Sequence, residues 1–337
     1  MRSRIPVILL NDTRADRHHG CTRVIEALLA LLEANGMDVV ASAPVHVDWR
    51  GLREVEEAFS RAKLVVVNGE GTLHHDRHAG RILLEAGAKA RAAGIPAVLV
   101  NAGWEANGEQ MFAMLRDFSL VAVRDSRSAI QIRGAGLACT IVPDLSLYLG
   151  GHPQSGKRAG IAFTDSVDRR STLLLDDVRR SCNAEWLPIQ SASGPRNEWR
   201  FVREGLSRSD LRDPRTGLRM FWIRNALRTA SLAMPGEFID RLAALELLVT
   251  GRFHACTLAM VAGTPFLATP SNTSKISALL EDAGLAAWRV ADSLSRTEIE
   301  AARRTGWESG ELSAISDYLA SARMRADTLF GEIARMA

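Results

Sequence analysis

Two residues that could do chemistry, Arg252 and His254, lie where a short apolar run meets a helical pattern. The run that starts at Leu247 ends before Gly251, and apolar residues at helical spacing follow from Ala255. Helix N-termini attract anions, and an arginine adds a fork of donors suited to phosphate or carboxylate. A histidine exchanges protons near neutral pH. The pattern therefore predicts an anion site with an acid or base beside it.

A polar loop close behind carries a third candidate, Lys275. The run from Pro265 to Ala268 predicts a strand, and the polar residues 269–275 lead into a further helix. Parallel sheets bind ligands beyond the carboxyl ends of their strands. We therefore expect Lys275 to lie near Arg252 and to add a second positive charge to the anion site.

The first half of the chain alternates between apolar runs and amphipathic stretches. Such alternation is typical of a parallel sheet with helices on both faces. The predicted strands cover residues 5–10, 37–41, 63–67, 95–100, 119–123 and 139–142, and the predicted helices cover 21–35, 52–62, 81–93, 110–118 and 126–134. The strand-end rule then selects the loops 11–20, 68–78 and 101–108 for ligand binding.

The second half repeats this pattern with shorter elements. Strands are predicted at 158–163, 185–189, 247–249, 265–268 and 287–290, and helices at 172–181, 276–283, 297–305 and 310–336. The segment 150–157 is rich in glycine and proline and predicts a domain boundary. We expect an α/β protein of two domains with parallel sheets, 1–150 and 151–337, the second ending in closing helices.

Several segments resemble, in their order along the chain, the motifs of polysaccharide pyruvyl transferases. They are 67–73 (VNGEGTL), 123–128 (VRDSRS), 143–147 (PDLSL), 250–254 (TGRFH), 263–265 (GTP), Lys275 and 284–285 (GL). The resemblance implies two Rossmann-like domains arranged as in GT-B glycosyltransferases, with the active site in the interdomain cleft. It also implies transfer of a pyruvyl group from phosphoenolpyruvate, the donor, to a sugar diol, which leaves a ketal. No nicotinamide, flavin or pyridoxal cofactor is implied.

Under this hypothesis His254 is the general acid that protonates the donor, and Glu70 helps to deprotonate an acceptor hydroxyl. Two glycines flank Glu70, and glycine lets the backbone approach a ligand closely. The residues expected to bind substrate are Asn11, His18, Asn68, Gly69, Gly71, Arg124, Arg252 and Lys275. Simpler interpretations are a solvated loop at 11–20, a glycine turn around Glu70, a surface ion pair for Arg124 and a structural role for His254.

Two other functions stay open. The family's Asn-x-Gly-Asp-like element is absent from 11–20. A GT-B-type glycosyltransferase with a nucleotide-sugar donor is therefore the runner-up, with Arg252 and Lys275 neutralising the diphosphate. A non-catalytic anion- or glycan-binding protein is the third class. Asp144 either braces the domain junction or contacts substrate.

The cluster His74, His75, Asp76 and His78 raises the question of a metal site. Zinc takes such side chains at helix or hairpin spacing with a dry surrounding shell. Histidines also line polar clefts that hold no metal. We expect no catalytic metal, and activity that survives treatment with a chelator.

Composition limits the binding partners and the cellular compartment that we expect. A net charge of +3 gives no support for a nucleic-acid partner, and the four cysteines lack C-x-x-C spacing, which fits a reducing cytoplasm. No apolar run has the length of a transmembrane helix. We expect a cytoplasmic enzyme with a saccharide acceptor, free or lipid-linked.

Residues 196–230 interleave arginines with Trp199, Phe201, Phe221 and Trp222. Three interpretations compete for this region. It is a pair of amphipathic helices with solvated arginines, a peripheral contact with anionic lipid at the inner face of the cytoplasmic membrane, or an RNA-binding segment. RNA binding ranks last because no RNA-binding module is visible.

Overall fold

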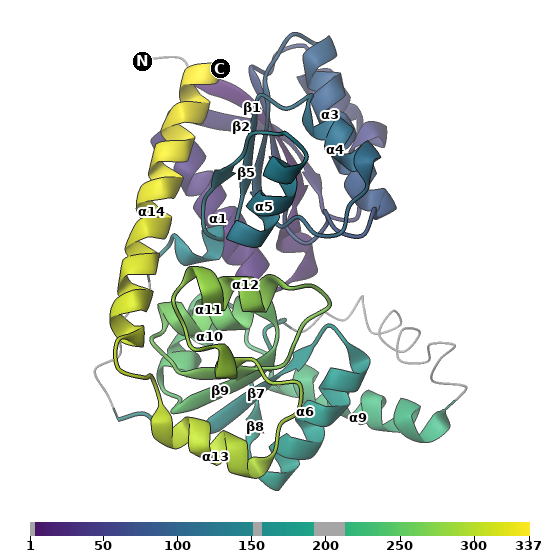
Figure 1. Ribbon diagram of the computed structural model, residues 1–337. Coiled ribbons are helices and arrows are strands. Elements are labelled where there is room, and N and C mark those ends of the chain that lie inside the picture. The colour runs from purple at the N-terminus through teal and green to yellow at the C-terminus, as the bar shows by residue number, and fades with distance from the viewer. Residues whose placement is uncertain (1–3, 151–156, 192–212) are drawn as a thin grey trace.

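The chain folds into two α/β halves that lie one above the other in Figure 1. The computed structural model describes residues 4–150, 157–191 and 213–337. The first half holds a six-stranded sheet in the order β2-β1-β3-β4-β5-β6, in which all neighbours pair in parallel. The strands are β1 (Ile5–Asp12), β2 (Met37–Pro44), β3 (Leu64–Asn68), β4 (Ala97–Ala102), β5 (Leu120–Val123) and β6 (Thr140–Ile141).

Alternation of side chains in β1 supplies apolar residues to both faces of this sheet. Ile8 and Leu10 join one buried cluster, and Val7 and Leu9 join another on the opposite face. The helices of this half are α1 (His19–Ala34), α2 (Arg53–Ala58), α3 (His78–Ala92), α4 (Glu109–Leu115) and α5 (Ser126–Gly134). Because helices cover both faces, the central strands β3 and β4 consist entirely of buried residues.

The second half holds a four-stranded sheet in the order β10-β9-β7-β8, again with parallel neighbours. Its strands are β7 (Ile161–Ser166), β8 (Glu185–Trp186), β9 (Leu247–Gly251) and β10 (Phe266–Ala268). Its helices are α6 (Arg169–Ser181), α9 (Pro214–Ala230), α10 (Pro235–Ala243), α11 (Phe253–Val261), α12 (Lys275–Asp282) and α13 (Arg296–Thr305), followed by α14 (Glu311–Met336). The predicted α/β class with two parallel sheets is confirmed.

The predicted strand at 287–290 is wrong. Residues Ala287–Arg289 form a 3-10 turn, η5. The side chain of Arg289 is fully buried, and its Nε and Nη2 donate to the Glu311 carboxylate at 2.8 and 2.5 Å. An arginine that points inward to α14 fixes the turn, and Val290 forms an isolated bridge to β10.

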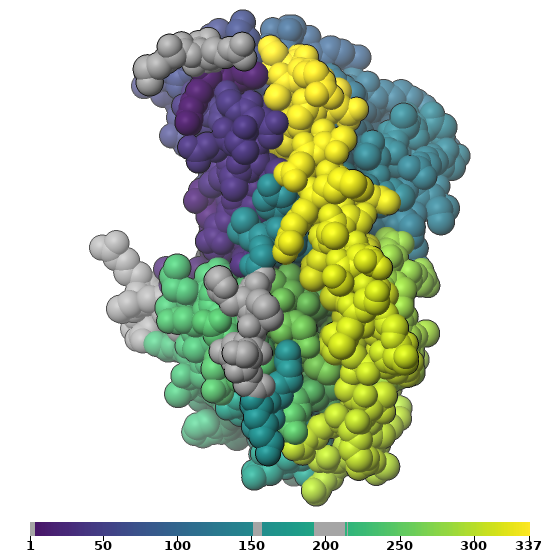
Figure 2. Space-filling model, turned by 90° about the vertical axis from the view of Figure 1, so that its left-hand side faces the viewer, coloured from purple at the N-terminus to yellow at the C-terminus, as the bar shows by residue number. Residues whose placement is uncertain are grey.

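The last helix, α14, contacts both halves of the molecule. Ile315 packs into a core of the second half, whereas Leu329, Phe330 and Ile333 pack into the cluster that α1 shares with the first sheet. Figure 2 shows the helix running across both halves. The predicted boundary segment 150–157 lies mostly outside the described residues. The helix that the prediction counts with the second domain therefore joins the two.

Candidate active site

Loops that follow strands of both sheets meet at one cavity of about 550 Å³ between the halves. Among the residues that line it are His18, Cys21, Glu70, Gly71 and Arg124 from the first half, and Arg252, His254 and Lys275 from the second. The anion-site hypothesis depends on Arg124, Arg252, His254 and Lys275. The structure brings all four into this cavity.

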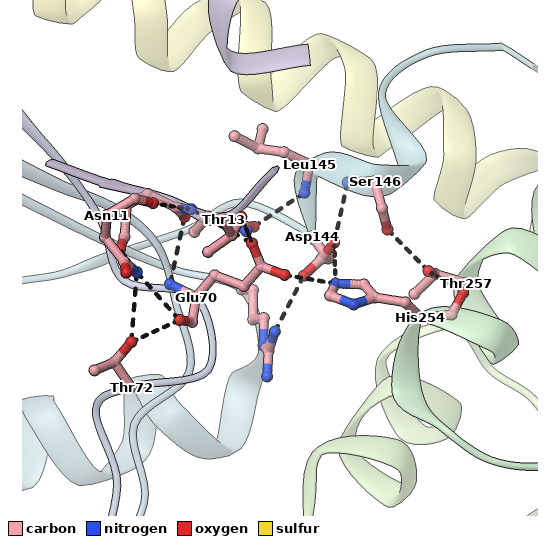
Figure 3. Close-up of polar contacts among 12 residues, drawn as sticks. Asn11, Thr13, Glu70, Thr72, Asp144, Leu145, Ser146, His254 and Thr257 are labelled. Atoms are coloured by element: carbon pink, nitrogen blue, oxygen red, sulfur yellow. Dashed lines mark hydrogen bonds and ion pairs between the residues drawn. The ribbon is translucent and has the colours of Figure 1, made fainter. Parts of the chain in front are cut away.

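His254 lies in the first turn of α11 and points across the domain junction (Figure 3). Its Nε2 lies 3.4 Å from Glu70 Oε1 and 3.6 Å from Asp144 Oδ1, and the residue is 8% exposed. Helix α1 of the first half passes so close that a Cβ added at Gly20 would lie 2.2 Å from His254 Cβ. Glycine at that position therefore lets the two halves approach around the imidazole.

The loop after β3 holds Glu70 at the cavity wall. Thr13 Oγ1 donates to Glu70 Oε2 at 2.7 Å, and Asn68 Nδ2 donates to the same oxygen at 3.4 Å. The other oxygen, Oε1, has no hydrogen-bond partner among the residues that the structure describes. One carboxylate oxygen is therefore fixed, and the other is left to face His254 and the cavity.

Three residues that we expected to contact substrate lie behind this wall instead. Asn11 Nδ2 donates to the Asn68 carbonyl at 2.7 Å and to the Glu70 carbonyl at 3.3 Å. A Cβ at Gly69 would come within 2.6 Å of Ala102, so the loop packs directly on β4. Asn11, Asn68 and Gly69 position the loop that presents Glu70, because their contacts are with protein rather than with the cavity.

Asp144 is the buried counter-charge of the site. Its Oδ2 accepts from Arg124 Nη1 at 3.2 Å, and its Oδ1 accepts from the Ser146 backbone N–H at 3.0 Å. Burial opposes ionisation, but the charges of His254 and Arg124 and the bond from Ser146 hold the pKa of Asp144 well below its usual range. The carboxylate is thus a fixed anion beside the imidazole.

The cationic side of the cavity consists of Arg124, Arg252 and Lys275. Arg252 is held by Asp165, which accepts from its Nε and Nη2 at 2.9 and 2.5 Å. Arg124 stacks on the Phe253 ring, with 4.3 Å from its guanidinium carbon to the ring centroid. Burial, with the charges of Arg124 and Arg252, lowers the pKa of Lys275 to about 8. Cations held this close together favour a bound anion.

Sequence reasoning did not find Asp165 as a partner of Arg252. The signal was present, since Asp165 lies near the end of β7 and the strand-end rule applies there too. It also gave no role to Glu105, whose carboxylate accepts from the Ser274 backbone N–H at 2.8 Å and from Ser274 Oγ at 2.6 Å. A loop of the first half thereby caps α12 directly before Lys275.

Further hydrogen bonds join the two halves across the junction. Ser146 and Thr257 hydroxyls lie 2.8 Å apart, and the His19 backbone N–H donates to the Ile189 carbonyl at 2.9 Å. The Ser126 backbone N–H donates to Asp282 at 2.8 Å. Hydrogen bonds from three separate segments of the first half therefore connect it to the second half.

The sequence model of the polysaccharide pyruvyl transferase family matches residues 23–272. The chain belongs to the polysaccharide pyruvyl transferase family. This is a family of transferases, and its name implies a saccharide acceptor. The matched range includes Glu70, Arg124, Arg252 and His254, and Lys275 lies just beyond it. The resemblance found from the ordered motifs is thus confirmed.

Solved structures with the fold of this pyruvyl transferase family member are distant in sequence. UGT89C1 of Arabidopsis thaliana complexed with UDP-L-rhamnose aligns with a TM-score of 0.55 at 10% identity, over 98% of this chain and 99% of that one. A putative UDP-N-acetylglucosamine 2-epimerase from Listeria monocytogenes gives a TM-score of 0.55 at 10% identity, over 96% and 94%. These similarities confirm the GT-B-like fold. No curated protein matches the chain in sequence.

The histidines of the 68–78 loop, where we expected no catalytic metal, make other contacts in the structure. His74 Nδ1 contacts His75 Nδ1 at 2.9 Å, and burial lowers the pKa of His74 to about 4. Asp76 instead accepts from the Gly108 backbone N–H at 2.9 Å. Within the described ranges, the group of three potential metal ligands that does form consists of His18, Cys21 and His254.

The arginine- and aromatic-rich region is only partly described, because 196–212 lie outside the described residues. Its remainder, α9, contacts β8 at the sheet edge. Leu218 and Trp222 of α9 are 60% and 61% exposed, and Arg219 pairs with Asp176 and Asp177. No helix in the described part of this pyruvyl transferase family member has the length and apolar character needed to cross a membrane. Membrane contact stays a prediction.

Proposed function

We propose that this protein transfers the pyruvyl group of phosphoenolpyruvate to two hydroxyls of a saccharide and so forms a ketal. The observation that carries the proposal is the convergence of Arg124, Arg252 and Lys275 on one cavity with His254 and Glu70. Phosphoenolpyruvate joins a phosphate and a carboxylate on a short carbon skeleton. A compact group of cations matches that double anion.

Two helix N-termini add to this positive field. α11 begins at Phe253, directly after Arg252, and α12 begins at Lys275. Backbone N–H groups in a first helical turn and the helix dipole both favour an anion. We place the donor phosphate and carboxylate among these groups, on the second half, and the saccharide on the side of Glu70.

The chemistry requires one proton at C3 of the donor and two new C–O bonds at C2. His254 donates a proton to the methylene carbon as C2 becomes electrophilic, and the first sugar hydroxyl adds to C2 while Glu70 accepts its proton. The C2–O bond to phosphate then breaks, and the second hydroxyl closes the ketal. Of the two hydroxyl protons, one replaces the proton spent at C3 and the other leaves with inorganic phosphate. The atoms balance without a redox cofactor.

Asp144 supports this cycle without contacting the reacting atoms. Its fixed negative charge, 3.6 Å from His254 Nε2, stabilises the imidazole when it carries a proton. Because Asp144 is also bound to Arg124, the acid and one donor-binding cation are held by the same carboxylate. The site thus couples placement of the donor to placement of the proton.

Phosphate release tests the proposal. Purified protein is incubated with phosphoenolpyruvate and candidate saccharides, and in parallel with nucleotide sugars. We expect inorganic phosphate from the first set and no nucleotide from the second. His254→Ala abolishes turnover while the circular dichroism spectrum stays unchanged, and His46→Ala, at an exposed histidine, serves as the matched control. Nucleotide release, or full activity of His254→Ala, would contradict the proposal.

The product gives a second, independent readout. Mass spectrometry of a surface glycan, or its precursor, from cells with and without this protein detects a pyruvate ketal as a fixed mass difference. Absence of that difference, together with phosphate release in vitro, would point to a different acceptor rather than a different donor.

A further inference from the structure

The same cavity contains a group of three potential metal ligands. His18, Cys21 and His254 each offer one donor atom, and the three atoms lie within 4.8 Å of one another. His18 and Cys21 come from the start of α1 in the first half, and His254 comes from α11 in the second. The two imidazoles meet edge to face, with ring centroids 5.3 Å apart.

One ring nitrogen of each histidine in this cluster lacks a hydrogen-bond partner in the described structure. His18 Nδ1 and His254 Nε2 are buried without a hydrogen bond, and so is Glu70 Oε1, 3.4 Å from His254 Nε2. Buried polar atoms without partners cost free energy. A neutral imidazole has one nitrogen with a free electron pair, and a carboxylate oxygen always has one, so the three atoms can offer electron pairs to a single occupant.

The donor set favours a soft divalent transition metal. Two imidazole nitrogens and a thiolate are ligands that zinc takes at catalytic and structural sites, and a carboxylate supplies a fourth. Tetrahedral zinc with these ligands places donor atoms about 3.4–3.7 Å apart. The three donor atoms now lie within 4.8 Å of one another, so metal binding requires the side chains to move closer together.

We propose that His18, Cys21 and His254 bind Zn²⁺ with Glu70 as the fourth ligand, and that the bound ion inhibits the enzyme. The Cys21 thiol releases one proton to solvent as its sulfur bonds to the metal, and no atom changes oxidation state. The inhibitory part rests on the proposed function, because the ion would occupy the acid and the base together. Removal of metal by a chelator then preserves or raises activity.

Metal binding is tested without turnover. The full chain, freed of metal, is titrated with Co²⁺, which reports a coordinating thiolate by a charge-transfer band in the near ultraviolet. We expect saturation at one equivalent, and loss of the band in Cys21→Ser. Cys139→Ser, which alters a half-buried cysteine outside the cluster, keeps it. Absence of the band in the unaltered protein, or its persistence in Cys21→Ser, overturns the site.

Inhibition is tested by phosphate release at increasing Zn²⁺. With each protein compared with its own activity in the absence of metal, Cys21→Ser needs at least about tenfold more Zn²⁺ for half inhibition, since the loss of even an outer-shell partner weakens metal binding by about that factor. Equal inhibition of both proteins overturns the inhibitory role. A Co²⁺ band in a protein that releases no phosphate would sustain the metal site while the proposed function fails. Phosphate release without any Co²⁺ band would sustain the proposed function while the metal site fails.

Discussion

The loop that carries Glu70 and the turn that carries Asp144 present two carboxylates to the same imidazole, but they hold them differently. His254 Nε2 lies 3.4 Å from the first and 3.6 Å from the second. Both oxygens of Asp144 are bound, one by Arg124 and one by a backbone N–H. Glu70 has one oxygen bound by Thr13, and its other oxygen is unbound in the described structure.

This difference assigns two roles to one kind of side chain. A carboxylate with both oxygens bound to donors is stabilised as an anion and is a poor proton acceptor. A carboxylate with one open oxygen beside a cavity can accept a proton from a bound hydroxyl. Environment, rather than residue type, therefore separates the fixed charge of Asp144 from the base that we propose Glu70 to be. Four sets of variants test that separation.

The largest effect is expected for Glu70→Gln. The amide keeps the shape and the contact with Thr13 but cannot take the hydroxyl proton. We expect kcat to fall by about 10²–10⁴-fold with little change in affinity for phosphoenolpyruvate. Steady-state kinetics measure kcat, and titration with phosphoenolpyruvate measures the affinity. A normal kcat with a large loss of donor affinity would instead place Glu70 on the donor side.

Asp144→Asn is expected to act mainly on stability. It leaves Arg124, which is 7% exposed, without its anion, and losing one partner of a buried ion pair costs about 3–5 kcal/mol. The free energy of unfolding from urea denaturation measures this loss. Glu70→Gln is the matched control, with an expected loss of about 1 kcal/mol. Equal losses for both variants would erase the distinction between the carboxylates.

The pH dependence above neutrality is expected to come from a cation rather than from either carboxylate. The pKa of Lys275 is lowered to about 8, so its positive charge is present below that pH and lost above it. kcat/KM for phosphoenolpyruvate therefore falls as pH rises through about 8. Lys275→Arg removes this fall, because a guanidinium stays charged. A decline that is unchanged in Lys275→Arg would assign it to another group.

The smallest effect is expected for Thr13→Val. This change removes the hydroxyl that donates to Glu70 Oε2 and leaves the volume nearly unchanged. One hydrogen bond is worth about 1 kcal/mol, which corresponds to a fall in kcat of roughly fivefold. Thr72→Val is the matched control, since Thr72 donates to the Glu70 carbonyl and not to the carboxylate. A larger fall in kcat for Thr72→Val than for Thr13→Val would show that the position of the loop backbone matters more than the hydrogen bond to the carboxylate.

Local pattern was enough to find the loops of the site. Apolar runs that end in polar residues placed Glu70, Arg252 and Lys275 at strand ends, and the parallel topology brought them together. Helical spacing likewise gave α5 and α14 nearly as observed. These features depend on neighbours within a few residues, so a single sequence is enough to predict them.

Contacts between residues far apart along the chain could not be predicted from the sequence. Asp165 lies 87 residues from Arg252, and although both residues lie at strand ends, no local pattern shows that they pair with each other. Asn11 and Asn68 look like substrate ligands in the sequence, because position at a strand end does not reveal which way a side chain points. The buried Arg289 turned an expected strand into a 3-10 turn through a partner on α14. Tertiary contacts decide such cases.

The attachment of α14 to both halves limits how the cavity can open. At about 1.5 Å per residue its 26 residues span roughly 39 Å, long enough to reach from one sheet to the other. Separation of the halves at this edge would expose the side chains that the helix buries, so α14 opposes opening there. Under the proposed function, we therefore expect the saccharide to enter from the edge opposite α14.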